Sequence, residues 1–226
     1  FPGQSAGTGV AAQPAPDNGF DLLAVIQISS AEAGELHLGS ESGPRFALRF
    51  SGDNHVLCAG AGEFRRTDAF SFCLRVKPTA SQNRAVLLHR SRAWTDSGSR
   101  GYELLLDQGR PFFGLSHFWP GNAVAVRAKQ SLPLDAWSHL AVTYDGSSRA
   151  AGLRLYLDGE ALESEVVRDR LTKDIVHRAE WGDAEVGTVA LALGGRFRDS
   201  GFKHGLIADV QVFDVALTAP EARTAA

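Results

Sequence analysis

The sequence predicts an all-β protein, a sandwich of two antiparallel sheets. Turn signals such as Asp145-Gly146 and Asp158-Gly159 recur at short intervals along the chain, as they do in sandwiches and barrels. The runs between these turns alternate between apolar and polar residues, which is the pattern of a strand with one face in the core. Helical signals are confined to the C-terminus. These three observations favour a β-sandwich over a helical or mixed fold.

Residues 1–19 are rich in Gly, Ala, Pro and Ser without a periodic pattern, and they predict a linker or an extended lead-in. Order is expected to begin near Phe20. Residues 20–226 contain no internal repeat of fixed period and no second compositional regime. We therefore predict a single domain over 20–226.

Four runs predict strands with one face in the core and one face in water. In the run 70–77 the core face would carry Phe70, Phe72, Leu74 and Val76, and the wet face Ser71, Cys73, Arg75 and Lys77. The runs 102–117, 139–146 and 206–214 alternate in a similar way.

A hairpin and a short helix complete the elements. Leu153, Leu155 and Leu157 alternate with polar neighbours up to Asp158-Gly159, which is a hairpin turn dipeptide. Near the C-terminus, Thr218 and Glu221 stand three positions apart as a capping box, which predicts the start of a helix.

Trp119 begins the tetrapeptide Trp-Pro-Gly-Asn between two strand-like runs. Pro120 fixes φ at the second turn position and Gly121 allows φ > 0 at the third, which predicts a type II turn. Trp119 would then be either displayed to a ligand or folded back to staple the loop. Trp137 opens an apolar strand and is interpreted as a packing residue, whereas Trp94 and Trp181 are left open.

Composition excludes some classes of function. The formal net charge of -3 argues against nucleic acid as a partner, so any anion site must be a local patch. No apolar run approaches the roughly 18 residues of a membrane-spanning helix, and no signal peptide is evident, so this segment is not expected to insert into a membrane. The chain begins at Phe1 and contains no methionine. We interpret it as a piece of a longer protein.

Cys58 and Cys73 are the only cysteines. They form no C-x-x-C pair, and no C-x-x-C-H motif marks a haem in this chain. One disulfide is possible if their strands are neighbours. Two buried thiols are the favoured reading, because free cysteine is among the most buried residue types.

Several segments, taken in order, carry a family resemblance. They are Trp137-Ser138-His139, Tyr144-Asp145-Gly146, the run 155–159, and the glycine-led strand from Gly205 to Phe213. From about Phe46 to Glu221 the chain resembles the laminin-G-like domains of the concanavalin A-like superfamily, which implies a jelly-roll β-sandwich. More narrowly, residues 101–127 and 144–159 look like the jelly-roll insert of large bacterial c-type cytochrome-like proteins. That resemblance implies an extracytoplasmic location (periplasmic, cell-surface or secreted), polysaccharide recognition, and contact with the remainder of a parent protein.

Calcium is the cofactor that the resemblance implies, because lectins of this kind hold Ca²⁺ with Asp and Asn oxygens at a sandwich edge. Asp53 and Asn54 match the family's loop. The last strand departs from the family's Ile-Asp-Glu pattern, since Ala208 stands at the usual carboxylate position and Asp209 follows it. The sequence therefore leaves two alternatives: a calcium site at Asp53, Asn54 and Asp209, or a plain Asx turn that needs no metal.

Catalysis by this domain is not expected. Retaining and inverting glycosidases need two placed carboxyls, and the E-x-D-x-x-E string of related hydrolases is missing here, with Asp183 and Glu185 as a weak substitute. A polysaccharide lyase is the enzymatic alternative. It could draw its base and cation from His117, Tyr102, Arg127 and Arg90, but the sequence does not show that these converge.

A non-catalytic saccharide site needs aromatic faces and a few planar polar groups. Three separate segments supply both, and Arg127 lies close to the second. The predicted ligand-binding residues are His89, Arg90, Arg92 and Trp94; His117, Trp119, Asn122 and Arg127; and Arg196 and Arg198. Arginine forks favour carboxylate or sulfate. The sequence thus predicts a carbohydrate-binding module for an acidic or sulfated polysaccharide, with a lyase or a structural docking module as alternatives.

Overall fold

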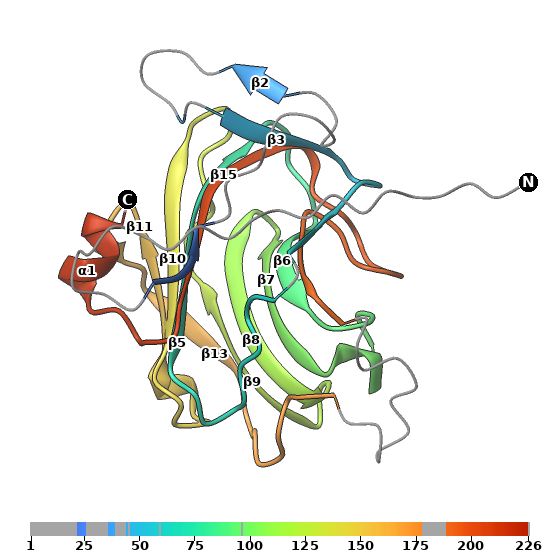
Figure 1. Cartoon of the computed structure of the whole chain (residues 1–226), viewed down its shortest axis with the longest axis vertical. Coiled ribbons are helices and arrows are strands. Elements are labelled where there is room, and N and C mark those ends of the chain that lie inside the picture. Colours follow the sequence, from blue (N-terminus) through green and yellow to red (C-terminus); the bar gives the residue numbers. More distant parts are fainter. Residues whose placement is uncertain are drawn as a thin grey trace, which may run out of the picture.

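A computed structural model describes residues 22–25, 36–38, 44, 46–58, 60–95, 97–177 and 189–225. The described strands form two antiparallel sheets that pack face to face (Figure 1). The predicted sandwich is therefore confirmed. The expected lead-in 1–19 lies outside the described residues, as do Trp181, Asp183 and Glu185. No helix among the described residues is long and apolar enough to span a bilayer.

Sheet A contains eight strands: β1 (Leu22–Val25), β2 (Leu36–Leu38), β3 (Phe46–Ser51), β5 (Phe70–Pro78), β10 (Ser138–Tyr144), β11 (Leu153–Leu157), β12 (Glu160–Ala161) and β15 (Lys203–Phe213). Their order is β12-β11-β10-β5-β15-β3-β2, with β1 paired to β15.

Sheet B contains seven strands: β4 (Val56–Cys58), β6 (Arg84–Arg90), β7 (Gly101–Asp107), β8 (Arg110–Phe118), β9 (Asn122–Ala128), β13 (Ser164–Asp169) and β14 (Leu191–Leu193). Their order is β13-β9-β8-β7-β6-β14-β4. The short helices are η1 (Ser97–Ser99), η2 (Ala150–Gly152) and α1 (Ala219–Thr224).

The core lies between the two sheets and follows the predicted alternation. Phe70, Phe72, Leu74 and Val76 of β5 are fully buried there against apolar side chains of sheet B. Phe64 stacks on Phe70 with ring centroids 4.3 Å apart. This interior packing leaves the outer face of sheet B available for a site.

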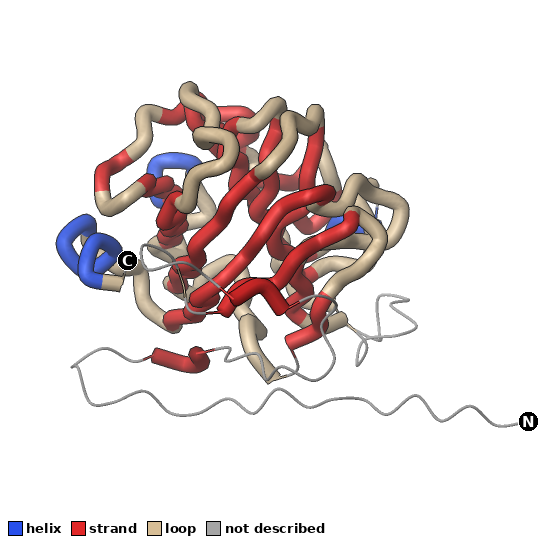
Figure 2. Tube along the Cα trace, turned by 90° about the horizontal axis from the view of Figure 1, so that it is seen from above, coloured by secondary structure: helices blue, strands red, loops and turns tan. Residues whose placement is uncertain are grey.

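The expectation of a solvent-exposed outer face on β5 was only half right, because Arg75 and Lys77 are partly exposed there but Ser71 and Cys73 are not. Ser71 and Cys73 are fully buried on that face, because the chain after β15 folds back over it. The Ser71 hydroxyl donates to the Val215 carbonyl (2.7 Å) and accepts from the Leu217 amide (2.9 Å). The segment ends in α1, which lies outside the sheets in Figure 2. The Thr218 amide donates to the Glu221 carboxylate (2.7 Å), which confirms the predicted capping box.

The two cysteines are free and buried, as favoured from the sequence. Cys58 belongs to the core between the sheets, whereas Cys73 lies beneath the C-terminal segment on the opposite side of sheet A. Burial raises the pKa of each thiol to about 12. Cys58 and Cys73 thus act as small apolar residues.

The two turns with the clearest sequence signals had different outcomes. Asp158 and Gly159 both have positive φ (51° and 81°), as a type I′ hairpin turn requires. At Trp119 the type II prediction was wrong. The Trp119–Pro120 peptide is cis, and Gly121 does not adopt a positive φ.

Candidate functional site

A cavity of about 580 Å³ opens on the outer face of sheet B, at the β6, β14 and β4 end. Strand register builds its floor, because Leu57, Ala192 and His89 are cross-strand neighbours and their side chains share one face. The walls come from the loop after β6 and the loop after β14. The cavity therefore joins two of the three segments that the sequence marked.

His89 anchors the floor of the cavity. Its Nε2 donates to the Gly195 carbonyl (2.9 Å), and its Nδ1 accepts from the Ser91 amide (3.2 Å). Burial, with the nearby positive charge of Arg196, lowers the pKa of His89 to about 3. His89 is thus a neutral residue with both nitrogens engaged. It positions the two loops, and it is not free to bind a ligand as the sequence predicted.

Arg196 forms part of the cavity wall but is ion-paired. Its side chain is 1% exposed and donates to the carboxylates of Glu103 and Asp199 and to the Ser91 hydroxyl (2.8 Å). Burial alone would raise the pKa of Asp199, but Arg84 and Arg196 outweigh it and hold that pKa below its usual value. The predicted role of Arg196 as a free guanidinium fork is therefore corrected to a structural one.

Arg92 and Arg198 line the same cavity. Both are exposed, and neither has an ion-pair partner among the described residues. Between Arg196 and Arg198 lies Phe197, which is 70% exposed, with the Arg198 guanidinium 5.2 Å from its ring centroid. The opening of the cavity thus presents two positive charges and an aromatic ring.

Sequence reasoning missed Phe197 and Leu57. Phe197 stands between two arginines that the sequence analysis did select, so its position carried a usable signal. Leu57 is 55% exposed on a three-residue edge strand. A run of that length is too short for an alternation argument.

Two predicted residues lie next to the cavity without lining it. Arg90 donates to the Glu63 carboxylate (2.7 Å), so its charge is compensated. Trp94 is 40% exposed and lies against the Arg84 guanidinium, 4.6 Å from its ring centroid.

The remaining four predicted residues lie elsewhere. Trp119 packs against Phe112 at 6.0 Å between ring centroids, on the half of sheet B formed by β8, β9 and β13. Arg127 is paired there with Asp107 and Glu165. These two residues therefore do not join the cavity.

His117 and Asn122 lie near the loop 172–174, at one end of the sandwich. His117 contributes to a separate cavity of about 700 Å³, and its Nδ1 is 2.6 Å from the Asp174 carbonyl. The Asn122 side chain is hydrogen-bonded to Thr172 and Lys173. The single rim expected from the sequence is thus split into separate regions.

The lyase alternative loses Tyr102 as a base, and its four residues do not converge. Tyr102 is buried in the core, where its hydroxyl donates to the Gly62 carbonyl (2.8 Å) and burial raises its pKa far above the ordinary value. Arg90 of β6 and Arg127 of β9 are each held by a different carboxylate. The four residues named for a lyase do not form one site.

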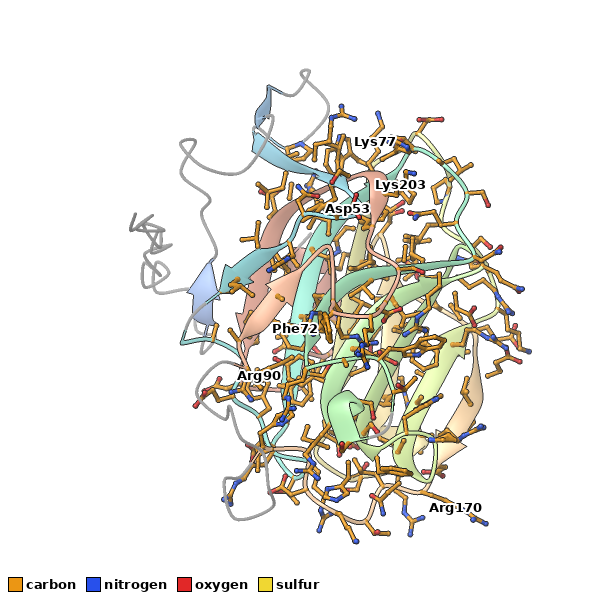
Figure 3. All side chains as sticks on the ribbon, turned by 90° about the vertical axis from the view of Figure 1, so that its right-hand side faces the viewer. Asp53, Phe72, Lys77, Arg90, Arg170 and Lys203 are labelled. Carbon is orange, nitrogen blue, oxygen red and sulfur yellow. The ribbon has the colours of Figure 1, made fainter. Side chains whose placement is uncertain are left out.

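The residues named for calcium do not fit a shared ion. Asn54 Oδ1 accepts from the amide of Ser51, three residues earlier (2.7 Å), and Asp209 pairs with Arg75 at 3.5 Å. Asp53 lies beside Lys203 at one end of the molecule (Figure 3). Asp209 is six residues further along β15, roughly 20 Å away at about 3.3 Å per residue. Among the described residues, no three His, Cys, Asp or Glu side chains are grouped as metal ligands.

Comparison with solved structures places this geometry among known folds. The binding domain of Paraclostridial Mosquitocidal Protein 1 is similar at a TM-score of 0.58 and 12% identity, over 84% of this chain and 44% of that one. The binding domain of botulinum neurotoxin serotype G gives 0.54 and 12%, over 92% and 46%. Domain 4 of an extracellular arabinanase from Geobacillus stearothermophilus, solved with arabinotriose, gives 0.50 and 19%, over 86% and 82%.

The chain spans less than half the length of the two toxin domains, and at these identities the likeness shows the fold alone. No curated protein sequence matches it. The family model described as "Concanavalin A-like lectin/glucanases superfamily" matches residues 50–223, which is most of the chain. The protein therefore belongs to the concanavalin A-like lectin/glucanase superfamily.

Proposed function

We propose that this domain is a non-catalytic carbohydrate-binding module that binds an acidic or sulfated polysaccharide in the cavity on sheet B. One observation carries the proposal: Arg92 and Arg198, both without an ion-pair partner among the described residues, flank the opening of a cavity of about 580 Å³ beside the exposed ring of Phe197.

The chemistry of the opening suits an anionic sugar. Guanidinium groups bind carboxylate and sulfate through paired hydrogen bonds, and an exposed ring offers an apolar face to the C–H side of a saccharide. The chain has a formal net charge of -3, so attraction of a polyanion depends on this local patch. The neutral His89 on the floor adds no charge to the site.

The family and one solved relative support a sugar as the ligand. The superfamily is named for lectins and glucanases, and the arabinanase domain was solved with arabinotriose. The four residues named for a lyase do not form one site, which favours binding over that form of catalysis. We also propose an extracytoplasmic location, where polysaccharides are met. None of the matches described above is a cytochrome, so the cytochrome-like parent stays a prediction from sequence resemblance.

Affinity electrophoresis through gels that contain neutral, uronate or sulfated polysaccharides tests the proposal. We expect retardation by an anionic polysaccharide and a loss of about tenfold in affinity for Arg198→Ala or Arg92→Ala, since a hydrogen bond to a charged group is worth roughly 1.5–3 kcal/mol. Phe197→Ala should weaken binding as well. Added salt should reduce the retardation.

Arg170→Ala is the matched control. Arg170 is an exposed arginine just after β13, at the opposite edge of sheet B from β14 and distant from Arg90 (Figure 3). Five interstrand steps of about 4.8 Å separate β13 from β14, or roughly 24 Å. If no polysaccharide retards the protein, the function is wrong and a docking role gains support. Equal retardation of all the arginine variants would show that the site lies elsewhere.

A further inference from the structure

Trp94 lies on the loop that forms one wall of the cavity, and its neighbours Ala93 and Thr95 line that wall. One face of its ring is covered by the Arg84 guanidinium at 4.6 Å from the ring centroid, while 40% of the residue stays open to solvent. A tryptophan ring that contacts a cation on one face and is partly exposed to solvent can receive a second flat apolar group.

Arg84 is held beneath Trp94 by a buried carboxylate. Asp199, whose side chain is 1% exposed, accepts from Arg84 Nε (2.7 Å) and from a terminal nitrogen of the same guanidinium (3.1 Å). This is the two-point geometry that fixes a guanidinium in orientation as well as in position. The position of Trp94 therefore depends on Asp199 through Arg84.

The same carboxylate also fixes the other wall of the cavity. Asp199 accepts from Arg196 Nε (3.1 Å) and from a terminal nitrogen of Arg196 (2.6 Å). Arg196 and Asp199 are only three positions apart, and they enclose Phe197 and Arg198 between them. One buried residue thus ties the loop that carries Trp94 to the loop that carries Arg198.

We propose that Trp94 is a stacking subsite for the apolar face of a sugar ring beside the cavity, and that Asp199 is the positioning residue that fixes Trp94 relative to Arg198. The proposal rests on the proposed function and extends it. A ligand that uses both places has at least two sugar units, one stacked on Trp94 and one bearing an anionic group toward Arg198.

Because Trp94, Arg84 and Arg196 are already ordered in the folded chain, less conformational entropy is lost when a ligand binds. Arginine side chains lose considerable rotamer freedom when they are ordered. For Arg84 and Arg196 this entropy is lost when the chain folds and not when a ligand binds. Tryptophan has only two side-chain torsions, so a single supporting contact restricts it strongly. Fewer groups then have to be ordered when the ligand arrives.

The test measures retardation by the anionic polysaccharide for the full chain and for a set of variants. Trp94→Ala should lose about tenfold in affinity and Trp94→Phe less, because phenylalanine keeps a ring face. Arg84→Gln removes the support of Trp94 but leaves the Arg196–Asp199 pair, so it should weaken binding without unfolding the domain. Asp199→Asn should weaken binding further, because it loosens both loops.

A double variant separates positioning from a general loss of structure. In a Trp94→Ala background, Arg84→Gln should cause no further loss, because its effect acts through the ring. Glu165→Gln is the control, since it removes a carboxylate paired with Arg127 at the far edge of the same sheet. It should leave retardation unchanged.

The variants test the stacking subsite, the positioning role and the proposed function separately. If Trp94→Ala is retarded like the original chain while Arg198→Ala is not, the stacking subsite is wrong and the proposed function stands. If Arg84→Gln weakens binding equally with and without Trp94, the positioning role is wrong. If the unaltered chain binds none of the polysaccharides, the proposed function fails and the subsite fails with it.

Discussion

At the scale of single residues, arginine shows what a sequence can and cannot reveal about a binding surface. The clusters were visible as spacing along the chain. Which of these arginines are neutralised by carboxylates was not visible, because most of the partners are distant in sequence, although Asp199 is only three positions from Arg196. Arg90 is paired with Glu63, 27 positions away, and Arg196 with Glu103, 93 positions away. Only the folded chain shows that Arg92 and Arg198 stay uncompensated among the described residues.

His89 gives a prediction for pH at the same scale. Its pKa in the folded chain is lowered to about 3, from an ordinary value of 6.5. Below pH 6.5 the unfolded chain therefore binds a proton that the folded chain does not, so stability falls as pH drops from about 6.5 toward 3, by up to about 1.4 kcal/mol per pH unit.

Urea unfolding at about pH 7 and pH 5 measures this loss. His89→Gln keeps a donor for the Gly195 carbonyl and cannot titrate, so its free energy of unfolding should change less between the two conditions. The pKa of His139 is also lowered, by burial and then by Arg75, but that group is present in both proteins. An identical pH dependence of the two proteins would contradict the account of His89.

At the scale of elements, features that depend on neighbouring residues were predicted correctly. Burial of a strand by a segment distant in sequence was not. The alternation in 70–77 predicted which side chains of β5 enter the core, and Asp158-Gly159 predicted its hairpin, because both depend on neighbours in sequence. The burial of Ser71 depends on Val215, 144 positions away. No pattern within β5 could reveal that the Ser71 and Cys73 end of its polar face would be covered.

Gly194 directly follows β14 and leads into the loop that carries Phe197 and Arg198. Its backbone conformation gives the second prediction at this scale. It has φ of +81°, and an added Cβ would lie 1.9 Å from the Phe50 ring. Gly194→Ala should destabilise the fold by about 2 kcal/mol or more, since backbone strain and a steric overlap add together. Thermal or urea unfolding measures the loss.

Gly60→Ala separates the two causes. Gly60 also has positive φ (75°), but nothing lies within 4 Å of an added Cβ. The Gly60→Ala variant should lose only about 1 kcal/mol of free energy of unfolding, which is the cost of placing alanine in the left-handed region. Equal losses at the two glycines would mean that Phe50 moves aside freely.

At the scale of the whole molecule, the two cysteines report on the integrity of both sheets. Cys58 lies in sheet B and Cys73 in sheet A, and burial raises both thiol pKa values to about 12. A thiol-specific chromogenic reagent should therefore react with neither in the native protein and with both after unfolding in denaturant, because the thiolate is the reactive form. Fast reaction of a thiol under native conditions would show that its sheet opens locally.

The jelly-roll architecture was predictable because family segments and alternation agreed along most of the chain. The site was only half predictable. The segments around His89 and Arg196 do meet at one cavity, but Trp119 and Arg127 lie on the other half of sheet B. Which loops adjoin is set by strand order, β14 beside β6 and β13 beside β9, and strand order is not encoded in any single run.

The covering of sheet A by α1 has a practical consequence. The C-terminal helix packs on the outer face of sheet A, whereas the cavity opens on the outer face of sheet B. A tether fused after the helix would emerge from the back of the molecule and leave the cavity turned toward solution. Immobilisation through that end should preserve sugar capture on a sensor surface, whereas random coupling through amines would orient the copies arbitrarily.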